Sequence, residues 1–248
     1  MASGANRGAY YAGFMRPLQE AGVRFDILAG VSAGGIAAAW FAAGDPDALE
    51  RSWREADRWR VALHPWLERG RWRTVDHLIR TITLQIMDLD AVLAAREEVR
   101  LVLSRITGPG FPLPRLERTV VSSRAIGSPE ALGLHLRATA FVPWINGFRS
   151  AIRIGEDRYL DGGVTGRVPL ATIAPGEVDE IWVAVCSPNG RRELEAELAV
   201  ARGRPERIIT ITPSEPLSMR RWTMEWDRVR RAIAIGRRDM ERTLAEFA

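Results

Sequence analysis

A serine between two glycines is the first feature of this sequence that could do chemistry. Ser32 lies in the segment "DILAGVSAGGIAAAW" (residues 26–40), with Gly30 and Gly34 two residues to either side. The pattern Gly-x-Ser-x-Gly is typical of a nucleophile elbow, a tight turn between a strand and a helix that presents a reactive hydroxyl. Glycine suits both flanking positions because strand and helix pass too close there for a Cβ. Ser32 is therefore a candidate nucleophile for acyl transfer.

Two other interpretations of the same stretch have to be weighed. Gly-x-Ser-x-Gly also occurs by chance in glycine-rich chains, and Ser32 would then be a small residue in a hydrophobic helix. The uncharged run from Ile27 to Gly44 has 18 residues, the lower limit for a membrane-spanning helix. Glycines interrupt this run, acidic Asp26 and Asp45 flank it, and it lies too far from the start for a signal peptide. We expect neither a transmembrane helix nor a signal peptide in this chain, and a cytoplasmic or peripheral membrane location.

A nucleophilic serine needs a group that accepts its proton. The chain has three histidines, His64, His77 and His135, and the order of an α/β-hydrolase, serine then acid then histidine, is possible with the last of them. Only 31 residues precede Ser32, however, too few for the strands that come before the elbow in that fold. The chymotrypsin and subtilisin orders fail because the serine precedes every histidine. The remaining constellation is "RYLDGGVTGRVPL", where Asp161 follows a strand pattern and two glycines follow Asp161.

The elements that must position these residues alternate between strand and helix patterns. With 248 residues and 46% apolar content the chain can bury a sizeable core, and we find no linker or repeat that would divide it, so we expect one domain over residues 1–248. Alternating strands and helices predict an α/β fold with a mostly parallel sheet. Strands are expected at 25–29, 118–123, 151–154, 158–160, 180–185 and 207–211; helices at 9–21, 33–43 and 218–247; and a helical and irregular region at 47–107.

Three blocks of the sequence, in this order, resemble the patatin-like phospholipase family. They are "SGANRGAYYAGFMRPLQEAG" (residues 3–22), "GVSAG" (30–34) and "DGG" (161–163), with a weaker fourth, "RATAFVPWI" (137–145). The resemblance implies a three-layer α/β/α fold and a serine acyl hydrolase acting on lipid or phospholipid acyl esters. It assigns a Ser32–Asp161 dyad without histidine, in which Asp161 takes the serine proton and later activates water. The family's glycine-rich loop, the oxyanion hole, maps onto Gly4, Ala5, Asn6 and Arg7, and Gly8, Gly30, Gly34, Gly162 and Gly163 are supporting turn glycines.

The chain departs from the family pattern at two places. Ala5 stands where the family usually has glycine, and we expect its N–H to serve as a donor only if the backbone keeps a negative φ. The family also has a strand directly before the loop, whereas this sequence begins at Met1, so the first strand before residue 3 is missing. Either residues upstream supply that strand or this protein lacks it, and we expect the former. These departures keep a second hypothesis open, a catalytically impaired homologue that binds lipid or a protein partner.

Tryptophan and arginine alternate in the variable region after the elbow helix. Trp53, Trp59, Trp66 and Trp72 lie among seven arginines in residues 51–73, a combination that suits a lipid interface as well as ordinary helix packing. All 35 basic residues are arginine, but the net charge is only +4 and no nucleic-acid-binding motif accompanies them, so we expect no nucleic acid partner. The single cysteine, Cys186, is expected to be a buried thiol near a strand. We expect no metal site and no cofactor.

Overall fold

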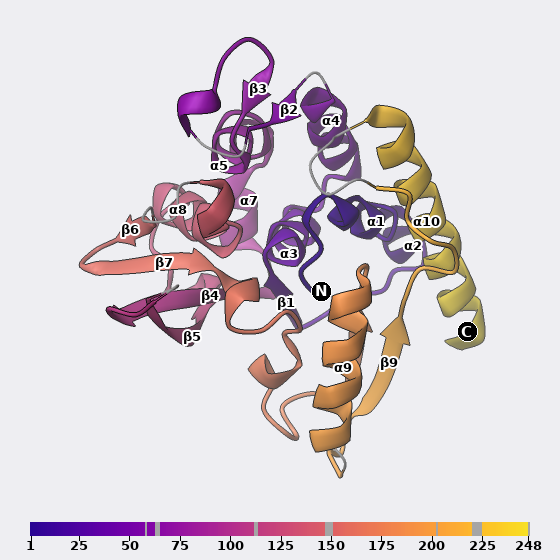
Figure 1. The fold of residues 1–248 in the computed structure, drawn as a ribbon. Coiled ribbons are helices and arrows are strands. Elements are labelled where there is room, and N and C mark those ends of the chain that lie inside the picture. The colour runs from indigo at the N-terminus through magenta and orange to yellow at the C-terminus, as the bar shows by residue number, and fades with distance from the viewer. Residues whose placement is uncertain are drawn as a thin grey trace.

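The structure is a computed structural model that describes residues 1–57, 59–62, 65–111, 114–146, 151–201, 203–219 and 225–247 (Figure 1). Its strands are β1 (Ile27–Val31), β2 (Arg60–Val61), β3 (Trp72–Arg73), β4 (Glu98–Gly108), β5 (Arg115–Ser122), β6 (Ile152–Ile154), β7 (Asp157–Asp161), β8 (Glu180–Ala184) and β9 (Arg207–Ile211). Its α-helices are α1 (Ala9–Ala12), α2 (Met15–Glu20), α3 (Ala33–Ala43), α4 (Pro46–Ala56), α5 (Val75–Leu78), α6 (Leu84–Ile86), α7 (Leu89–Ala94), α8 (Pro129–Thr139), α9 (Pro188–Val200) and α10 (Trp226–Phe247). Short helical turns are η1 (Ala5–Gly8), η2 (Pro65–Leu67), η3 (Ile79–Thr83, a π-helix), η4 (Ser123–Ala125), η5 (Pro143–Ile145), η6 (Gly162–Val164) and η7 (Leu170–Thr172).

The long strand β4 organises the main sheet. β5 pairs antiparallel along one edge of β4, over residues 100–108. The other edge is shared, because β1 runs parallel to residues 98–102 and β7 runs antiparallel to residues 103–105. β6 continues the sheet beyond β7, and β8 and β9 form a separate parallel pair. The carboxyl ends of β1 and β7 therefore meet end to end beside the middle of β4.

The expectation of a helical and irregular region at 47–107 is wrong from Glu98 onward, where β4 begins. Arg100 is the third residue of this strand, and such a charge argues against a strand buried on both faces. Its guanidinium is neutralised by Glu98, with an N–O distance of 3.0 Å, and by Glu177, which is distant in the sequence. The other expected strands are confirmed within a few residues. The expected helix at 9–21 is interrupted at Gly13, where the backbone of α10 leaves no room for a Cβ.

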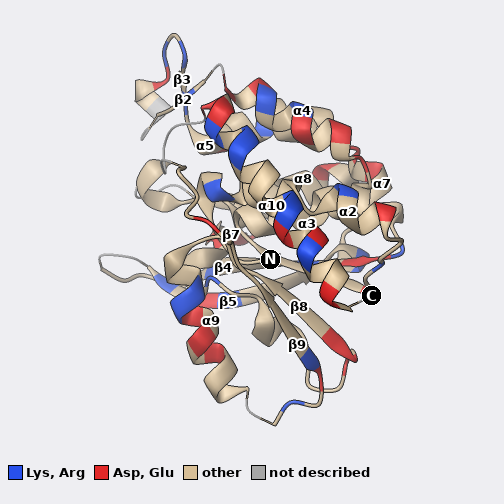
Figure 2. Ribbon diagram, turned by 90° about the vertical axis from the view of Figure 1, so that its right-hand side faces the viewer, with Lys and Arg blue, Asp and Glu red and all other residues tan. Residues whose placement is uncertain are grey.

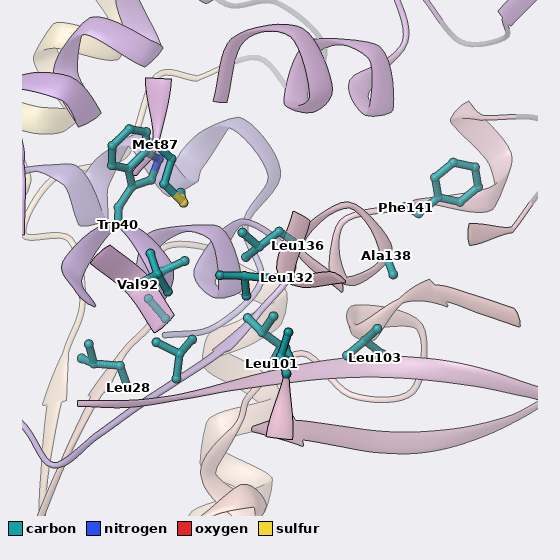
Figure 3. Packing of buried hydrophobic residues seen from close by; sticks show 14 of the residues in the cluster. Leu28, Trp40, Met87, Val92, Leu101, Leu103, Leu132, Leu136, Ala138 and Phe141 are labelled. Carbon is teal, nitrogen blue, oxygen red and sulfur yellow. The ribbon is translucent and has the colours of Figure 1, made fainter. Parts of the chain in front are cut away.

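Helices cover both faces of the sheet and make three layers. On one face, Leu101 and Leu103 of β4 point toward Leu132 and Leu136 of α8, and these side chains form a cluster with α3 (Figure 3). On the opposite face, α9 and the segment around η7 cover β8 and the residues of β1 that point away from α3. Successive side chains of β1 therefore enter different cores, as the alternation of a strand requires. No helix among the described residues is long and apolar enough to cross a membrane.

The first three residues lie between β1 and β8. The Met1 amino group donates to the Ala29 carbonyl at 2.7 Å, and the Val31 N–H donates to the Met1 carbonyl at 3.2 Å. On the other side, the Ala2 N–H donates to the Ala184 carbonyl at 2.9 Å. A cavity of about 310 Å³ continues between the two strands past Met1. The strand that we expect before residue 3 would lie between β1 and β8, and it stays a prediction.

Candidate active site

Ser32 occupies the sharp turn between β1 and α3. Its backbone has φ 56° and ψ −124°, which are strained angles for a residue with a Cβ and cost about 1–3 kcal/mol. A Cβ at Gly30 would overlap the backbone of Gly34, and one at Gly34 would overlap the Met1 carbonyl oxygen. The two glycines thus let the turn close, for the steric reason that their spacing predicts. Ser32 is also the N-cap of α3, whose positive end faces the turn.

Asp161 is the last residue of β7 and lies on β4 next to the position where β1 ends. Val31 pairs with Val102, and Asp161 pairs with Leu103, so neighbouring positions of one strand hold the two chain ends. The Ser32 hydroxyl donates to Asp161 Oδ2 at 2.7 Å, and both residues are buried, with exposed fractions of 7% and 4%. The structure thus brings together the two residues that the sequence singles out, although 129 positions separate them.

The end of α8 holds both residues in place. Thr139 Oγ1 accepts a hydrogen bond from the Ser32 N–H at 3.0 Å and donates to the Val102 carbonyl at 2.7 Å. Two residues later, the Phe141 carbonyl accepts from the Asp161 N–H at 2.9 Å. These contacts explain the fourth sequence block, residues 137–145, as the segment that fixes the elbow and the aspartate together. Thr139 itself was not among the predicted site residues, and its place in that block is the signal that could have found it.

Ser104 is a second supporting residue that the sequence analysis missed. Its fully buried hydroxyl donates to the Asp161 carbonyl at 2.8 Å and also lies 2.9 Å from Thr165 Oγ1. The predicted glycines after the aspartate pack against the same strand: a Cβ at Gly162 would overlap the Val102 carbonyl. The Gly163 N–H donates to Asp161 Oδ1 at 2.7 Å. Both carboxylate oxygens of Asp161 therefore have a donor, one from its own turn and one from Ser32.

Burial raises the pKa of the Asp161 carboxyl from its ordinary value of 3.8 to about 6. The hydrogen bonds from Ser32 and Gly163 and the charge of Arg167 lower the pKa, but they are smaller effects than desolvation. A carboxylate with this pKa is a better proton acceptor than a free one and is still ionised at neutral pH. Raised carboxyl pKa values in a buried pair with a hydroxyl are typical of catalytic sites.

The glycine-rich loop forms η1 beside Ser32, and Ala5, Asn6 and Gly8 line the same cavity as the serine. The Arg7 N–H donates to the Gly4 carbonyl at 3.1 Å and closes this turn. Ala5 has φ +49°, so the negative φ on which the sequence analysis made the donor role of its N–H depend is absent. The loop keeps the left-handed backbone of a glycine, and the exposed position of Ala5 leaves room for the methyl group. The strain at Ala5 costs about 1 kcal/mol.

Two glycines of the loop pack closely against neighbouring elements. A Cβ at Gly4 would overlap Cys186 Sγ, and one at Gly8 would lie 2.8 Å from the Ala33 Cβ, next to the serine. Arg7 lies half-buried in η1. Cys186 is buried directly after β8, as expected, and burial raises the pKa of its thiol to about 11. It is therefore a packing residue that supports the loop.

The described histidines have partners other than the serine. His135 Nδ1 lies 2.7 Å from the Ala131 carbonyl within α8, and burial lowers its pKa. His77 Nδ1 lies 3.1 Å from Glu68 Oε2. His64 lies outside the described residues. Among the residues that the structure describes, no three His, Cys, Asp or Glu side chains gather in a way that could hold a metal ion.

The four tryptophans of residues 51–73 separate into two groups. Trp53 lines the cavity at Ser32, and Trp59 is half-buried with the Arg73 guanidinium 4.6 Å from its ring centre. Trp66 and Trp72 are 81% and 51% exposed. Trp53 and Trp59 therefore fit ordinary packing, the alternative that the sequence left open, and membrane contact of the four tryptophans stays a prediction.

Comparison with protein-family models finds one match that covers the site. Residues 1–173 match the model described as Patatin-like phospholipase, a stretch that contains η1, the elbow and Asp161. A search of curated proteins finds no match to the chain.

Proposed function

Because the chain belongs to the patatin-like phospholipase family, a family of lipid acyl hydrolases, we propose that it cleaves acyl esters of lipids through Ser32 and Asp161. The observation that carries the proposal is the 2.7 Å hydrogen bond from the Ser32 hydroxyl to the buried Asp161 carboxylate. The hydroxyl is held at a strained turn, next to a cavity with mostly apolar walls.

The proposed reaction has two steps. In the first, Ser32 Oγ attacks the ester carbonyl carbon while Asp161 takes the hydroxyl proton and passes it to the leaving alcohol oxygen, giving an acyl-enzyme. In the second, water attacks the acyl-enzyme, Asp161 takes the water proton and returns it to Ser32, and the fatty acid leaves. The main-chain N–H groups of Gly4 and Ala5, together with Asn6 and Arg7 of the same loop, are proposed to stabilise the oxyanion. For Ala5 this proposal drops the requirement of a negative φ, because the loop keeps the left-handed backbone of a glycine there.

A fluorophosphonate probe tests the proposal without knowledge of the substrate, since it forms a bond to an activated serine and releases fluoride. We expect Ser32 to be labelled, and labelling to fall about tenfold per pH unit below pH 6, because Asp161 must be ionised to accept the proton. The Ser32→Ala variant and heat-unfolded protein are the controls. If neither the native protein nor any fragment containing Ser32 is labelled, the result would instead favour the non-catalytic homologue that binds lipid or a protein partner.

We also propose that the protein docks on anionic membranes through the segment from Arg60 to Arg73, here called the β2–β3 loop. Trp66, Leu67 and Trp72 are exposed on this loop, and Figure 2 shows its described residues, 60–62 and 65–73, projecting from the molecule with blue arginine segments. Tryptophan rings favour the headgroup depth of a bilayer, and each nearby arginine adds about 1 kcal/mol toward anionic lipid. The loop leads directly into α5, which lines the cavity at Ser32, so docking would bring that cavity to the lipid.

Changing Trp66 and Trp72 together to Ser is expected to weaken binding to phosphatidylglycerol vesicles by about tenfold or more, because each buried large side chain contributes about 1.5–3 kcal/mol. Co-sedimentation with vesicles measures this, and added salt should weaken binding further. The matched control is Phe111→Ser, since Phe111 is 98% exposed at the end of the β4–β5 hairpin. Equal losses for both variants, or binding indifferent to salt, would contradict docking through this loop.

A further inference from the structure

A cavity of about 140 Å³ opens at Ser32 and runs along α3. Four residues of α3 line it, Ala33, Ile36, Ala37 and Trp40, at the spacing of one helix face. The other walls come from α4, α5, the π-helical turn η3 and the loop after α8, and their lining side chains are mostly apolar. An apolar cavity with a reactive hydroxyl at one end is suited to an acyl chain whose carbonyl group lies at that hydroxyl.

Two buried side chains line this cavity at the end of α3 that lies away from Ser32. Trp40 is the last lining residue of α3 and is 1% exposed, and Leu49 of α4 lines the cavity within the same buried cluster. α3 and α4 are joined by only Gly44 and Asp45, the connection of an antiparallel helix pair, so the start of α4 lies near the end of α3. A chain that enters at Ser32 therefore meets Trp40 and Leu49 after following α3.

Two independent measures of the cavity agree on its capacity. The seven-residue step from Ala33 to Trp40 corresponds to about 10 Å along the helix axis, and an extended chain advances about 1.2 Å per bond, which gives about eight carbons. A volume of 140 Å³ is close to that of an apolar cavity of about 150 Å³ that holds benzene, which gives about six carbons. The small side chains of Ala33 and Ala37 leave this space open.

We infer that the enzyme selects acyl groups of about six to eight carbons, and that Leu49 and Trp40 set this limit by closing the cavity. The inference rests on the proposed function, since it takes the cavity to hold the acyl group that Ser32 attacks. Longer acyl chains would have to leave part of their length outside the cavity. One missing or excess methylene in such a pocket changes kcat/KM by about 10–200-fold.

The test is a series of p-nitrophenyl esters from butanoyl to hexadecanoyl. The natural chain is expected to turn over the hexanoyl and octanoyl esters at least about tenfold faster, in kcat/KM, than the hexadecanoyl ester. Leu49→Ala deepens the cavity and should move the optimum to longer chains, and Ala37→Leu should move it to shorter ones. The matched control is Leu194→Ala, an equally buried leucine of α9 on the opposite face of the sheet, which should leave the optimum unchanged.

A binding measurement separates this inference from the proposed function. Calorimetry with the Ser32→Ala variant is expected to show tighter binding of octanoate than of butanoate or hexadecanoate, whether or not the natural chain turns over esters. Octanoate selectivity without fluorophosphonate labelling would overturn the proposed function and leave the acyl cavity standing. Ester turnover that is greatest for hexadecanoyl, with the profile unchanged by Leu49→Ala and Ala37→Leu, would overturn the acyl cavity and leave the proposed function standing.

Discussion

Replacing Ser32 with Ala, or Asp161 with Asn, is expected to lower kcat for ester hydrolysis by about 10⁴-fold or more. Ser32→Ala removes the nucleophile, and Asp161→Asn removes the acceptor of its proton while keeping the shape of the side chain. Because the two act as a unit, the double variant should be no worse than the poorer single one. Release of p-nitrophenol from the octanoyl ester measures the loss, and far-ultraviolet circular dichroism checks that the fold is kept.

The control variants address the alternative of a histidine base. His77→Ala and His135→Ala should each retain most of the turnover, since the described rings bond to Glu68 and to the Ala131 carbonyl instead of Ser32. His64→Ala should do the same. A folded but inactive His135→Ala, combined with an active Asp161→Asn, would show that the base has been wrongly assigned.

The same carboxylate is expected to destabilise the folded protein at neutral pH. The pKa of Asp161 is about 6 when folded and about 3.8 when unfolded, so the folded state binds the proton more tightly. Below pH 3.8 the carboxyl is protonated in both states and does not lower the free energy of unfolding. Between pH 3.8 and pH 6 the unfolded state gives up its proton while the folded state keeps it, so the free energy of unfolding falls across this window. A difference of about two pKa units corresponds to a loss of about 3 kcal/mol, which is complete above pH 6.

Asp161→Asn cannot ionise, so its stability should not fall over this interval. Relative to the natural chain, the free energy of unfolding of Asp161→Asn is expected to rise by about 3 kcal/mol between pH 4 and pH 8. The amide side chain of Asp161→Asn can accept only one of the two hydrogen bonds from Ser32 and Gly163. The loss of the other lowers the stability of Asp161→Asn equally at every pH, so it does not affect the change in stability between pH 4 and pH 8.

Urea unfolding of both proteins across this pH range measures the change. The matched control is Ser32→Ala, which is equally inactive but keeps the titrating carboxylate, so its stability should decline between pH 4 and pH 8 as that of the natural chain does. Parallel curves for Asp161→Asn and the natural chain would show that Asp161 does not have a raised pKa in the folded state.

The sequence predicted the two residues that the structure brings together, Ser32 and Asp161, better than the elements that support them. Gly-x-Ser-x-Gly and Asp-Gly-Gly are local patterns with a local steric cause, so Ser32 and Asp161 could be found without knowledge of the fold. β4 was not predicted, and no local pattern shows that the charge of Arg100 within it is neutralised, because its partner Glu177 is distant in the sequence. Thr139 and Ser104 are ordinary polar residues whose importance comes from partners far along the chain. The tryptophans could not be divided from sequence for the same reason, since only the folded chain shows that Trp53 lines the cavity and that Trp66 and Trp72 are exposed on the loop.

The end-to-end arrangement of β1 and β7 on β4 has a consequence for how this fold can diverge. Asp161 and Val31, the residue before Ser32, pair with two successive residues of one strand, Leu103 and Val102, whose Cα atoms are about 3.8 Å apart. The long connection from α4 to α7 and the turn between β6 and β7 lie outside the place where β1 and β7 end on β4. Insertions and deletions there can remodel the cavity and the exposed β2–β3 loop while the serine and aspartate keep their spacing. New specificities are therefore accessible to this architecture through changes of length in its connections, with the reaction centre left untouched.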